Sequence, residues 1–145
     1  MKKSREKLAM LMPEFVLERI NTFEVSGIFL KELIANNTKM RVMKSKGGGS
    51  LEMVQIAGLS YTYDSKKILE GNPDFLVSVI VAGNQVEDNK TYKIATNNYI
   101  TAQLRKFFGD VSQMPEFIDT GLIDRDVIIE AVEMQKTLIP LPKKE

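Results

Sequence analysis

Few residues of this chain have the types and spacing that catalysis or metal binding requires. The sequence contains no histidine and no cysteine, so it supplies neither an imidazole base nor a thiolate nucleophile nor a zinc–thiolate site. Enzymes that hydrolyse phosphate esters with two metal ions hold those ions with imidazoles and carboxylates. No tight cluster of Asp and Glu stands out in this sequence. We therefore expect no catalytic residue and no metal-binding residue in this chain.

Three polar motifs resemble functional sites, and each has a simpler structural interpretation. The run KSKGGGS at 44–50 leads into a strand, whereas a phosphate-binding loop leads into a helix, so we expect a flexible connector. Asp64 follows a strand and can bond to its own downstream backbone, which predicts a turn. Asp124 and Asp126 are expected at the N-terminus of a helix, where the helix dipole favours negative charge.

The elements that position these residues are mainly strands in the middle of the chain. Residues 77–82 alternate with the period of a strand, Gly83 and Asn84 suit a tight hairpin turn, and residues 91–96 alternate again. Two further extended segments are expected upstream, and their apolar residues are Leu51, Met53, Leu59, Tyr61 and Tyr63. The pattern predicts a meander with a largely buried sheet.

A first helix is expected after a short strand at 21–25. Ser26 is a favourable N-cap, and we expect the helix to end at Asn36 and Asn37. Its apolar stripe, at helical spacing, consists of Phe29, Leu30, Leu33 and Ile34.

Two more helices are expected toward the C-terminus. One covers about residues 101–108, because apolar residues recur at helical spacing and Gly109 is placed to end the helix. The other begins at Asp124. Between the central strands, residues 65–74 are expected to form a charged loop. The buried residues of the two helices are expected to be Phe107 and Phe108 in the first, and Val127, Ile128, Ala131 and Val132 in the second.

The composition is that of one ordinary globular domain. The chain has 145 residues, of which 43% are hydrophobic and 27% charged, and this length allows a sizeable core without disulfides. A net charge of +1 does not indicate the excess of basic residues that binds nucleic-acid polymers, so we expect no such polymer as a partner. The apolar patch near the N-terminus is too short and interrupted for a signal peptide or a membrane span. We expect no membrane segment in this chain.

Three stretches of the sequence resemble successive motifs of one known family. They read MVQIAGLSYTYD, VSVIVAGNQVEDNKTYKIATNNY and IDTGLIDRDVIIEAV. Their order and spacing are similar to those of the C-terminal domain of the 5'-nucleotidase, UDP-sugar hydrolase and 2',3'-cyclic nucleotide phosphodiesterase family. The resemblance implies such a domain at 15–140, a linker or helical lead-in at 1–14 and a tail at 141–145. It also implies an α+β fold class: a single compact domain with mixed, largely antiparallel β-sheets flanked by helices.

The resemblance further implies a substrate-binding site. In that family, two aromatic side chains of this domain hold the substrate's base between them. One matches Tyr99, which follows the family's Ala-Thr-x-Asn pattern, and the other matches Phe15 more loosely. Asn98 is expected beside them as a substrate-binding residue. The alternative is that Tyr99 and Phe15 are core or interface aromatics. The family's Gly-Gly-Asp-Gly loop, whose Asp contacts the substrate's sugar hydroxyls, has no match between Asn98 and Asp110.

The function implied by the resemblance is that of a substrate-recognition domain in a 5'-nucleotidase-type hydrolase. The ligand would be a nucleotide, a nucleoside or a UDP-sugar. Hydrolysis would be performed by an N-terminal metallophosphatase domain, in the same precursor or in trans. The divalent metal pair would belong to that domain, so this chain contains no cofactor and is expected to be inactive alone. The alternative is a non-catalytic interaction or structural module that kept the fold and lost ligand binding.

The N-terminus favours the interpretation that the chain is an excised domain. The family's catalytic domain precedes the part that this chain resembles, so we interpret Met1 as an artificial start. The family is usually exported, and its members are periplasmic or at the cell surface. This chain alone indicates no localisation.

Overall fold

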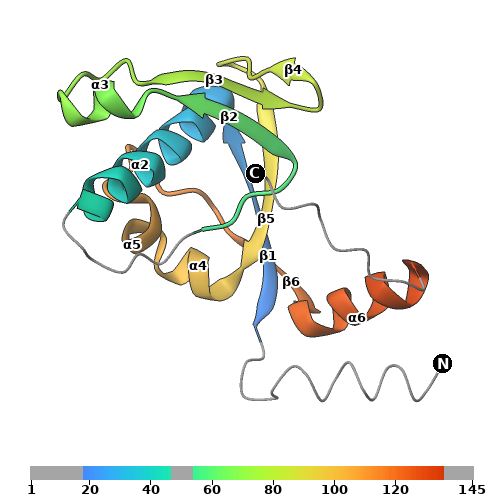
Figure 1. The fold of residues 1–145 in the computed structure, drawn as a ribbon. Coiled ribbons are helices and arrows are strands. Elements are labelled where there is room, and N and C mark those ends of the chain that lie inside the picture. The colour runs from blue at the N-terminus through green and yellow to red at the C-terminus, as the bar shows by residue number, and fades with distance from the viewer. Residues whose placement is uncertain (1–17, 47–53, 136–145) are drawn as a thin grey trace.

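The computed structural model describes residues 18–46 and 54–135 (Figure 1). Within these ranges the elements are β1 (Arg19–Ser26), α2 (Gly27–Lys46), β2 (Leu59–Tyr63), α3 (Ser65–Leu69), β3 (Leu76–Val81), β4 (Asn84–Gln85), β5 (Thr91–Asn97), α4 (Asn98–Ala102), α5 (Leu104–Phe108), β6 (Ile118–Ile123) and α6 (Asp124–Gln135). The predictions that lie outside the described residues are those for 1–14, Phe15, the glycines of the 44–50 connector, Leu51, Met53 and the tail at 141–145. The fold class is α+β, as predicted.

One sheet consists of three antiparallel strands in the order β5-β1-β6. The β1–β5 ladder is regular from Ile20 opposite Asn97 to Ser26 opposite Thr91. The ladder between β1 and β6 is irregular next to Asn21. The central position of β1 explains why its inward-facing residues are the most deeply buried of this sheet, and the strand predicted at 21–25 is confirmed.

The second sheet, in the order β2-β3-β4, contains a hairpin that was predicted one residue too late. Ala82 and Gly83 form the turn, with φ of 51° and 80°, and Val81 pairs with Asn84. Two residues with positive φ match the twist of the flanking strands. This register also brings the backbone nitrogen of Val86 to the carbonyl oxygen of Val79, to which it donates at 2.9 Å, whereas a turn at Gly83 and Asn84 would pair Ala82 with Gln85. Asn84 therefore begins β4 instead of forming the turn.

Helix α2 begins as predicted but is longer than predicted. The hydroxyl of Ser26 accepts a hydrogen bond from the backbone nitrogen of Phe29 at 3.3 Å, which is the expected N-cap. The helix passes Asn36 and Asn37 without a break and ends at Lys46. The side-chain nitrogen of Asn37 donates to the carbonyl oxygen of Phe107 at 2.8 Å. Because this long-range bond occupies the amide, Asn37 does not compete with the helix backbone.

The core lies where α2 packs against both sheets (Figure 1). Gly27, at the start of α2, is in close contact with the turn that follows β4. A Cβ at this position would lie 1.9 Å from the carbonyl oxygen of Glu87, so only glycine fits. The buried core residues are Phe23, Val25, Phe29, Leu30, Leu33, Ile34, Val79 and Val86. All four residues predicted for the α2 stripe are among them.

The segment predicted as a charged loop at 65–74 begins with the short helix α3. Asp64 is its N-cap, because its Oδ1 accepts from the backbone nitrogens of Lys66 at 3.0 Å and Lys67 at 3.3 Å. The local backbone-bonding role predicted for Asp64 is confirmed. The loop prediction is wrong for Ser65–Leu69, where Asp64 satisfies two of the backbone donors that the first turn of a helix leaves open.

The buried face predicted for α6 is wrong, although the helix begins at Asp124 as predicted. Ile129 is the buried residue of this helix, whereas Val127 and Ile128 are exposed. Figure 1 shows that α6 projects from β6, away from α2 and the second sheet. The predicted stripe therefore lies largely at the surface of the described part of the chain.

Candidate functional site

The helix predicted at about 101–108 is present, but it begins earlier, at Asn98, so that Tyr99 lies in its first turn, and it forms two short helices instead of one. Helix α4 ends and α5 begins around Gln103, whose φ of −124° and ψ of 36° are not helical. The break allows Thr101 to be buried from α4 while Leu104 and Phe107 are buried from α5. Gly109 adopts a φ of 67° and its nitrogen donates to Arg105, so the predicted glycine at the helix end is confirmed.

Three hydrogen bonds, each made by an asparagine side chain, hold α4 against the first sheet. The Oδ1 of Asn97 accepts from the backbone nitrogen of Ile100 at 3.0 Å and caps the helix. The Oδ1 of Asn98 accepts from the backbone nitrogen of Arg19 at 2.8 Å. The side-chain nitrogen of Asn21 donates to the hydroxyl of Thr101 at 2.8 Å. The first bond holds α4 to the end of β5, and the other two join α4 to β1.

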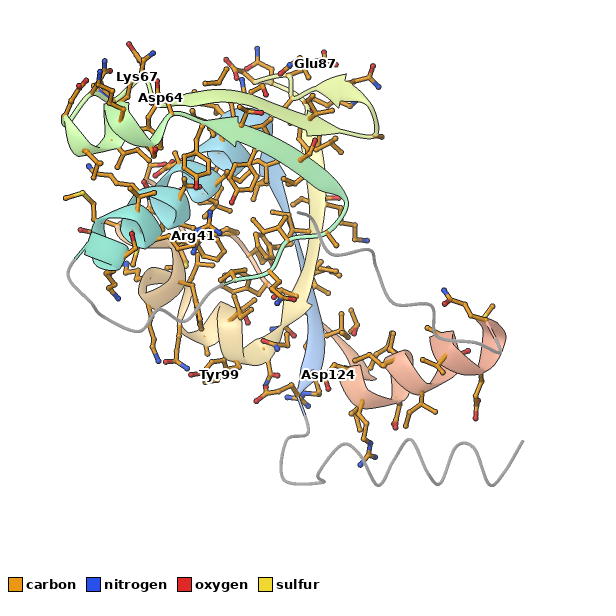
Figure 2. The ribbon with its side chains drawn as sticks, viewed as in Figure 1. Arg41, Asp64, Lys67, Glu87, Tyr99 and Asp124 are labelled. Atoms are coloured by element: carbon orange, nitrogen blue, oxygen red, sulfur yellow. The ribbon has the colours of Figure 1, made fainter. Side chains whose placement is uncertain are left out.

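Tyr99 lies on the outer side of α4 with 41% of its surface exposed (Figure 2). Its ring meets the edge of Phe107 at a centroid distance of 5.8 Å and an interplanar angle of 68°. The Lys106 ammonium lies 5.8 Å from the Tyr99 ring centroid and 3.4 Å from its hydroxyl oxygen. Tyr99 is therefore a surface aromatic held in place by its neighbours and is not a core residue.

The other predicted site residues have different outcomes. Phe15 lies outside the described residues. Asn98 is half-buried next to Tyr99, and its side-chain oxygen is occupied by Arg19. Phe107 is buried as predicted, and Phe108 is half-buried against the core.

Sequence reasoning missed Asn21 and Thr101, which are both buried beneath the Tyr99 helix. A signal was present for Asn21. It alternates with Phe23 and Val25, so it was placed on the inward face of a strand where an apolar residue is the rule. No sequence signal indicated its partner, because the two residues are 80 positions apart.

A cavity of about 260 Å³ lies on the inner side of the same region. It is bounded by α2, β5 and the segment 54–59, and its mainly apolar lining includes Leu33, Ile94 and Phe108. Tyr99 does not line it. The exposed ring and the cavity are therefore separate features.

A comparison with protein-family models identifies the chain. The model of the 5'-nucleotidase C-terminal domain matches residues 7–110. The chain belongs to this family.

Solved structures agree with this assignment. The 5'-nucleotidase C-terminal domain described here is similar to the NAD nucleotidase (NadN) of Haemophilus influenzae, with a TM-score of 0.68 at 20% identity over 95% of this chain. It is also similar to a 5'-nucleotidase precursor from Thermus thermophilus, with a TM-score of 0.65 at 18% identity over 87% of this chain. At these identities the similarity shows the fold alone. The domain covers only 26% and 24% of those two chains. No curated protein matches the sequence.

The described part of this C-terminal domain does not fit a divalent metal pair. Across residues 18–46 and 54–135, no three side chains of His, Cys, Asp or Glu come together in a way that could hold a metal ion. The carboxylate of Asp126 instead lies 3.4 Å from the guanidinium of Arg125. In the same ranges, no helix has the length and apolar character that crossing a membrane requires.

Proposed function

We propose that this chain is the substrate-recognition domain of a 5'-nucleotidase-type hydrolase, and that it holds the base of a nucleotide or UDP-sugar against Tyr99. A separate N-terminal metallophosphatase domain, with its divalent metal pair, would hydrolyse the phosphoester. The observation that carries the proposal is the exposed ring of Tyr99. Exposed aromatic side chains that are fixed by their neighbours are suited to stacking on bases, because every base has a π-face.

The surroundings of Tyr99 support this function. The edge contact with Phe107 limits the rotation of the ring. The Lys106 ammonium is close to the same ring and places positive charge near a ligand that carries phosphate. Asn98 contributes a side-chain nitrogen, since only its oxygen is bonded to Arg19. That nitrogen can donate to an acceptor on the base.

Phe15 is proposed as the second aromatic of the site. The bond between Arg19 and Asn98 shows that the chain enters β1 beside the first turn of α4. Phe15 precedes Arg19 by four residues, which span at most about 14 Å. Covalent reach therefore permits Phe15 to stack on the other face of a base that contacts Tyr99.

Binding to this domain alone is expected to be weak. Stacking contributes about 1–3 kcal/mol per base and aromatic side chain, or about 2–6 kcal/mol for two aromatics. Association costs about 4–15 kcal/mol in lost translational and rotational freedom. Stacking energies measured by substitution already include part of that cost, so we expect a dissociation constant no tighter than about 1 mM, which corresponds to about −4.1 kcal/mol. The metal ions of the catalytic domain would supply the remaining affinity through the phosphate.

We predict that AMP at millimolar concentration shifts the NMR signals of the Tyr99 amide and ring. Tyr99→Ala should abolish the response, whereas Tyr99→Phe should keep most of it, because the stacking face remains. Tyr63 is a matched control, since it is exposed to a similar extent, 36%, on β2. Tyr63→Ala should leave the response of Tyr99 unchanged. An unchanged response at residues next to position 99 in Tyr99→Ala would contradict the proposal.

A second candidate function is an interaction or structural module that has lost ligand binding. The observation that favours it is a group of exposed apolar side chains on β6 and α6, namely Ile118, Leu122, Ile128 and Met134. Exposed apolar groups of this kind often mark protein contacts. The titration separates the two candidates, because this module would show no shift at Tyr99 at any AMP concentration.

A further inference from the structure

A polar residue lies on the inward face of β1, the central strand of the first sheet. Asn21 is 8% exposed and shares the inward face of β1 with Phe23 and Val25. Its side-chain nitrogen donates to the hydroxyl of Thr101, which is 7% exposed. Its side-chain oxygen has no hydrogen-bond partner among the residues that the structure describes. An apolar residue would fill this position without leaving a buried acceptor unsatisfied, so stability alone does not account for an asparagine here.

The bond between Asn21 and Thr101 continues toward Tyr99. The hydroxyl of Thr101 donates onward to the carbonyl oxygen of Asn98 at 3.2 Å. Asn98 and Thr101 flank the part of α4 that carries Tyr99. The path from β1 to the first turn of α4 therefore consists of two consecutive hydrogen bonds, and it lies beneath the exposed ring.

A helix of five residues cannot hold its own position. Isolated helices of this length are unstable in water, because nucleation costs more than a single turn returns. Helix α4 depends on its contacts with β1 and on the Asn97 cap. Apolar contacts are not directional, whereas a hydrogen bond restricts both distance and angle. The Asn21–Thr101 pair can therefore set the rotation of α4 about its axis, and that rotation decides the direction of the Tyr99 ring.

We infer that Asn21 and Thr101 are positioning residues for base recognition: their buried hydrogen bond orients α4 so that the ring of Tyr99 faces the ligand. The inference rests on the proposed function of Tyr99. Neither residue needs to touch the ligand, since both are buried and act through the helix. The ligand is the base of a nucleotide, as proposed above. Asn21 and Thr101 contribute to its recognition by fixing the direction of the Tyr99 ring.

Two substitutions at one position separate the hydroxyl from the bulk of Thr101. Thr101→Val keeps the shape and removes the hydrogen bond, whereas Thr101→Ser keeps the hydroxyl and removes a methyl group. We expect Thr101→Val to weaken the binding of AMP at Tyr99 about fivefold, the factor that one ordinary hydrogen bond represents. Thr101→Ser should bind as the wild type does. A merely structural role predicts equal AMP affinities in the wild type and in both variants, whatever their thermal midpoints.

A second readout does not depend on the ligand. The Tyr99 and Phe107 rings are close enough, at 5.8 Å between centroids, to give NOEs between their protons. These NOEs should be lost or strongly reduced in Thr101→Val and kept in Thr101→Ser. If the wild type shows no response to AMP, the proposed function fails. The NOEs then decide by themselves whether the pair orients the ring.

A double variant covers the case in which Thr101→Val does not fold because the Asn21 nitrogen is left unsatisfied. Asn21→Val combined with Thr101→Val removes both partners and leaves no buried polar side-chain atom at either position. We expect this protein to fold and to show the same losses in AMP affinity and in Tyr99–Phe107 NOEs. Wild-type AMP affinity together with wild-type NOEs in the double variant would overturn the inference.

Discussion

The isolated chain is expected to release no phosphate from AMP or from 2',3'-cyclic AMP in the presence of Mg²⁺, Mn²⁺ or Zn²⁺. The sequence has no histidine, and the described residues bring together no set of carboxylates that could hold a metal ion. Enzymes accelerate their reactions by at least about a millionfold over the uncatalysed rate. We therefore expect the rate with this chain to be indistinguishable from that of buffer with metal, in an assay of free phosphate.

A control distinguishes a contaminating phosphatase from activity of the chain itself. Residual turnover that persists unchanged in the Asp124→Asn and Asp126→Asn variants, and that declines with further purification, comes from a contaminant. Metal-dependent turnover that follows the protein through purification and disappears with substitutions in this chain would contradict the proposal that a separate domain performs the hydrolysis.

Phe29→Ala is expected to destabilise the protein by about 3–5 kcal/mol, the usual effect of removing a buried phenyl ring. Phe29 is 1% exposed in the core between α2 and the two sheets. Ile28, its neighbour in sequence, is 62% exposed, and Ile28→Ala should change the free energy of unfolding by no more than about 0.5 kcal/mol. Urea unfolding followed by circular dichroism measures both.

The contrast between these neighbouring positions tests how α2 is oriented on the sheets. Similar losses for Phe29→Ala and Ile28→Ala would mean that α2 presents a different face to the core from the one described. A loss at Ile28 alone would mean that the helix is rotated by about one position.

Features that depend on neighbouring residues could be predicted from the sequence. Ser26 at the start of α2 and Gly109 at the end of α5 have the predicted roles, because a cap is decided by a side chain and the backbone within one turn. Asp64 bonds to its own downstream backbone as predicted, although there it caps a helix. The strands at 77–82 and 91–96 were also found, since a period of two needs only a short window.

Features that depend on distant residues could not be predicted. Asn36 and Asn37 were expected to end α2, but Asn37 bonds to Phe107, 70 positions away. The buried face predicted for α6 was wrong, because a stripe at helical spacing does not indicate which elements will lie beside the helix; Ile129 is buried, whereas Val127 and Ile128 are exposed. The hairpin turn was displaced to Ala82 and Gly83 by the register of β3 in its sheet.

The candidate site likewise combines a local feature that could be predicted with long-range contacts that could not. Tyr99 was proposed as a site residue from a short motif, and in the structure it is exposed on α4. The structure adds what the motif did not contain: the link from Asn98 to Arg19, and the pair formed by Asn21 and Thr101. Both join β1 to a helix about 80 positions away, and nothing in the sequence indicates which residues meet.

The most direct measurement of the central claim is a comparison of two ligands that differ only in the base. AMP and ribose 5-phosphate carry the same sugar and phosphate, so an NMR titration with each isolates the contribution of stacking. We predict that millimolar AMP shifts the ring and amide signals of Tyr99, and that ribose 5-phosphate at the same concentrations does not. Equal shifts with both ligands, or no shift with either, would contradict base recognition at Tyr99.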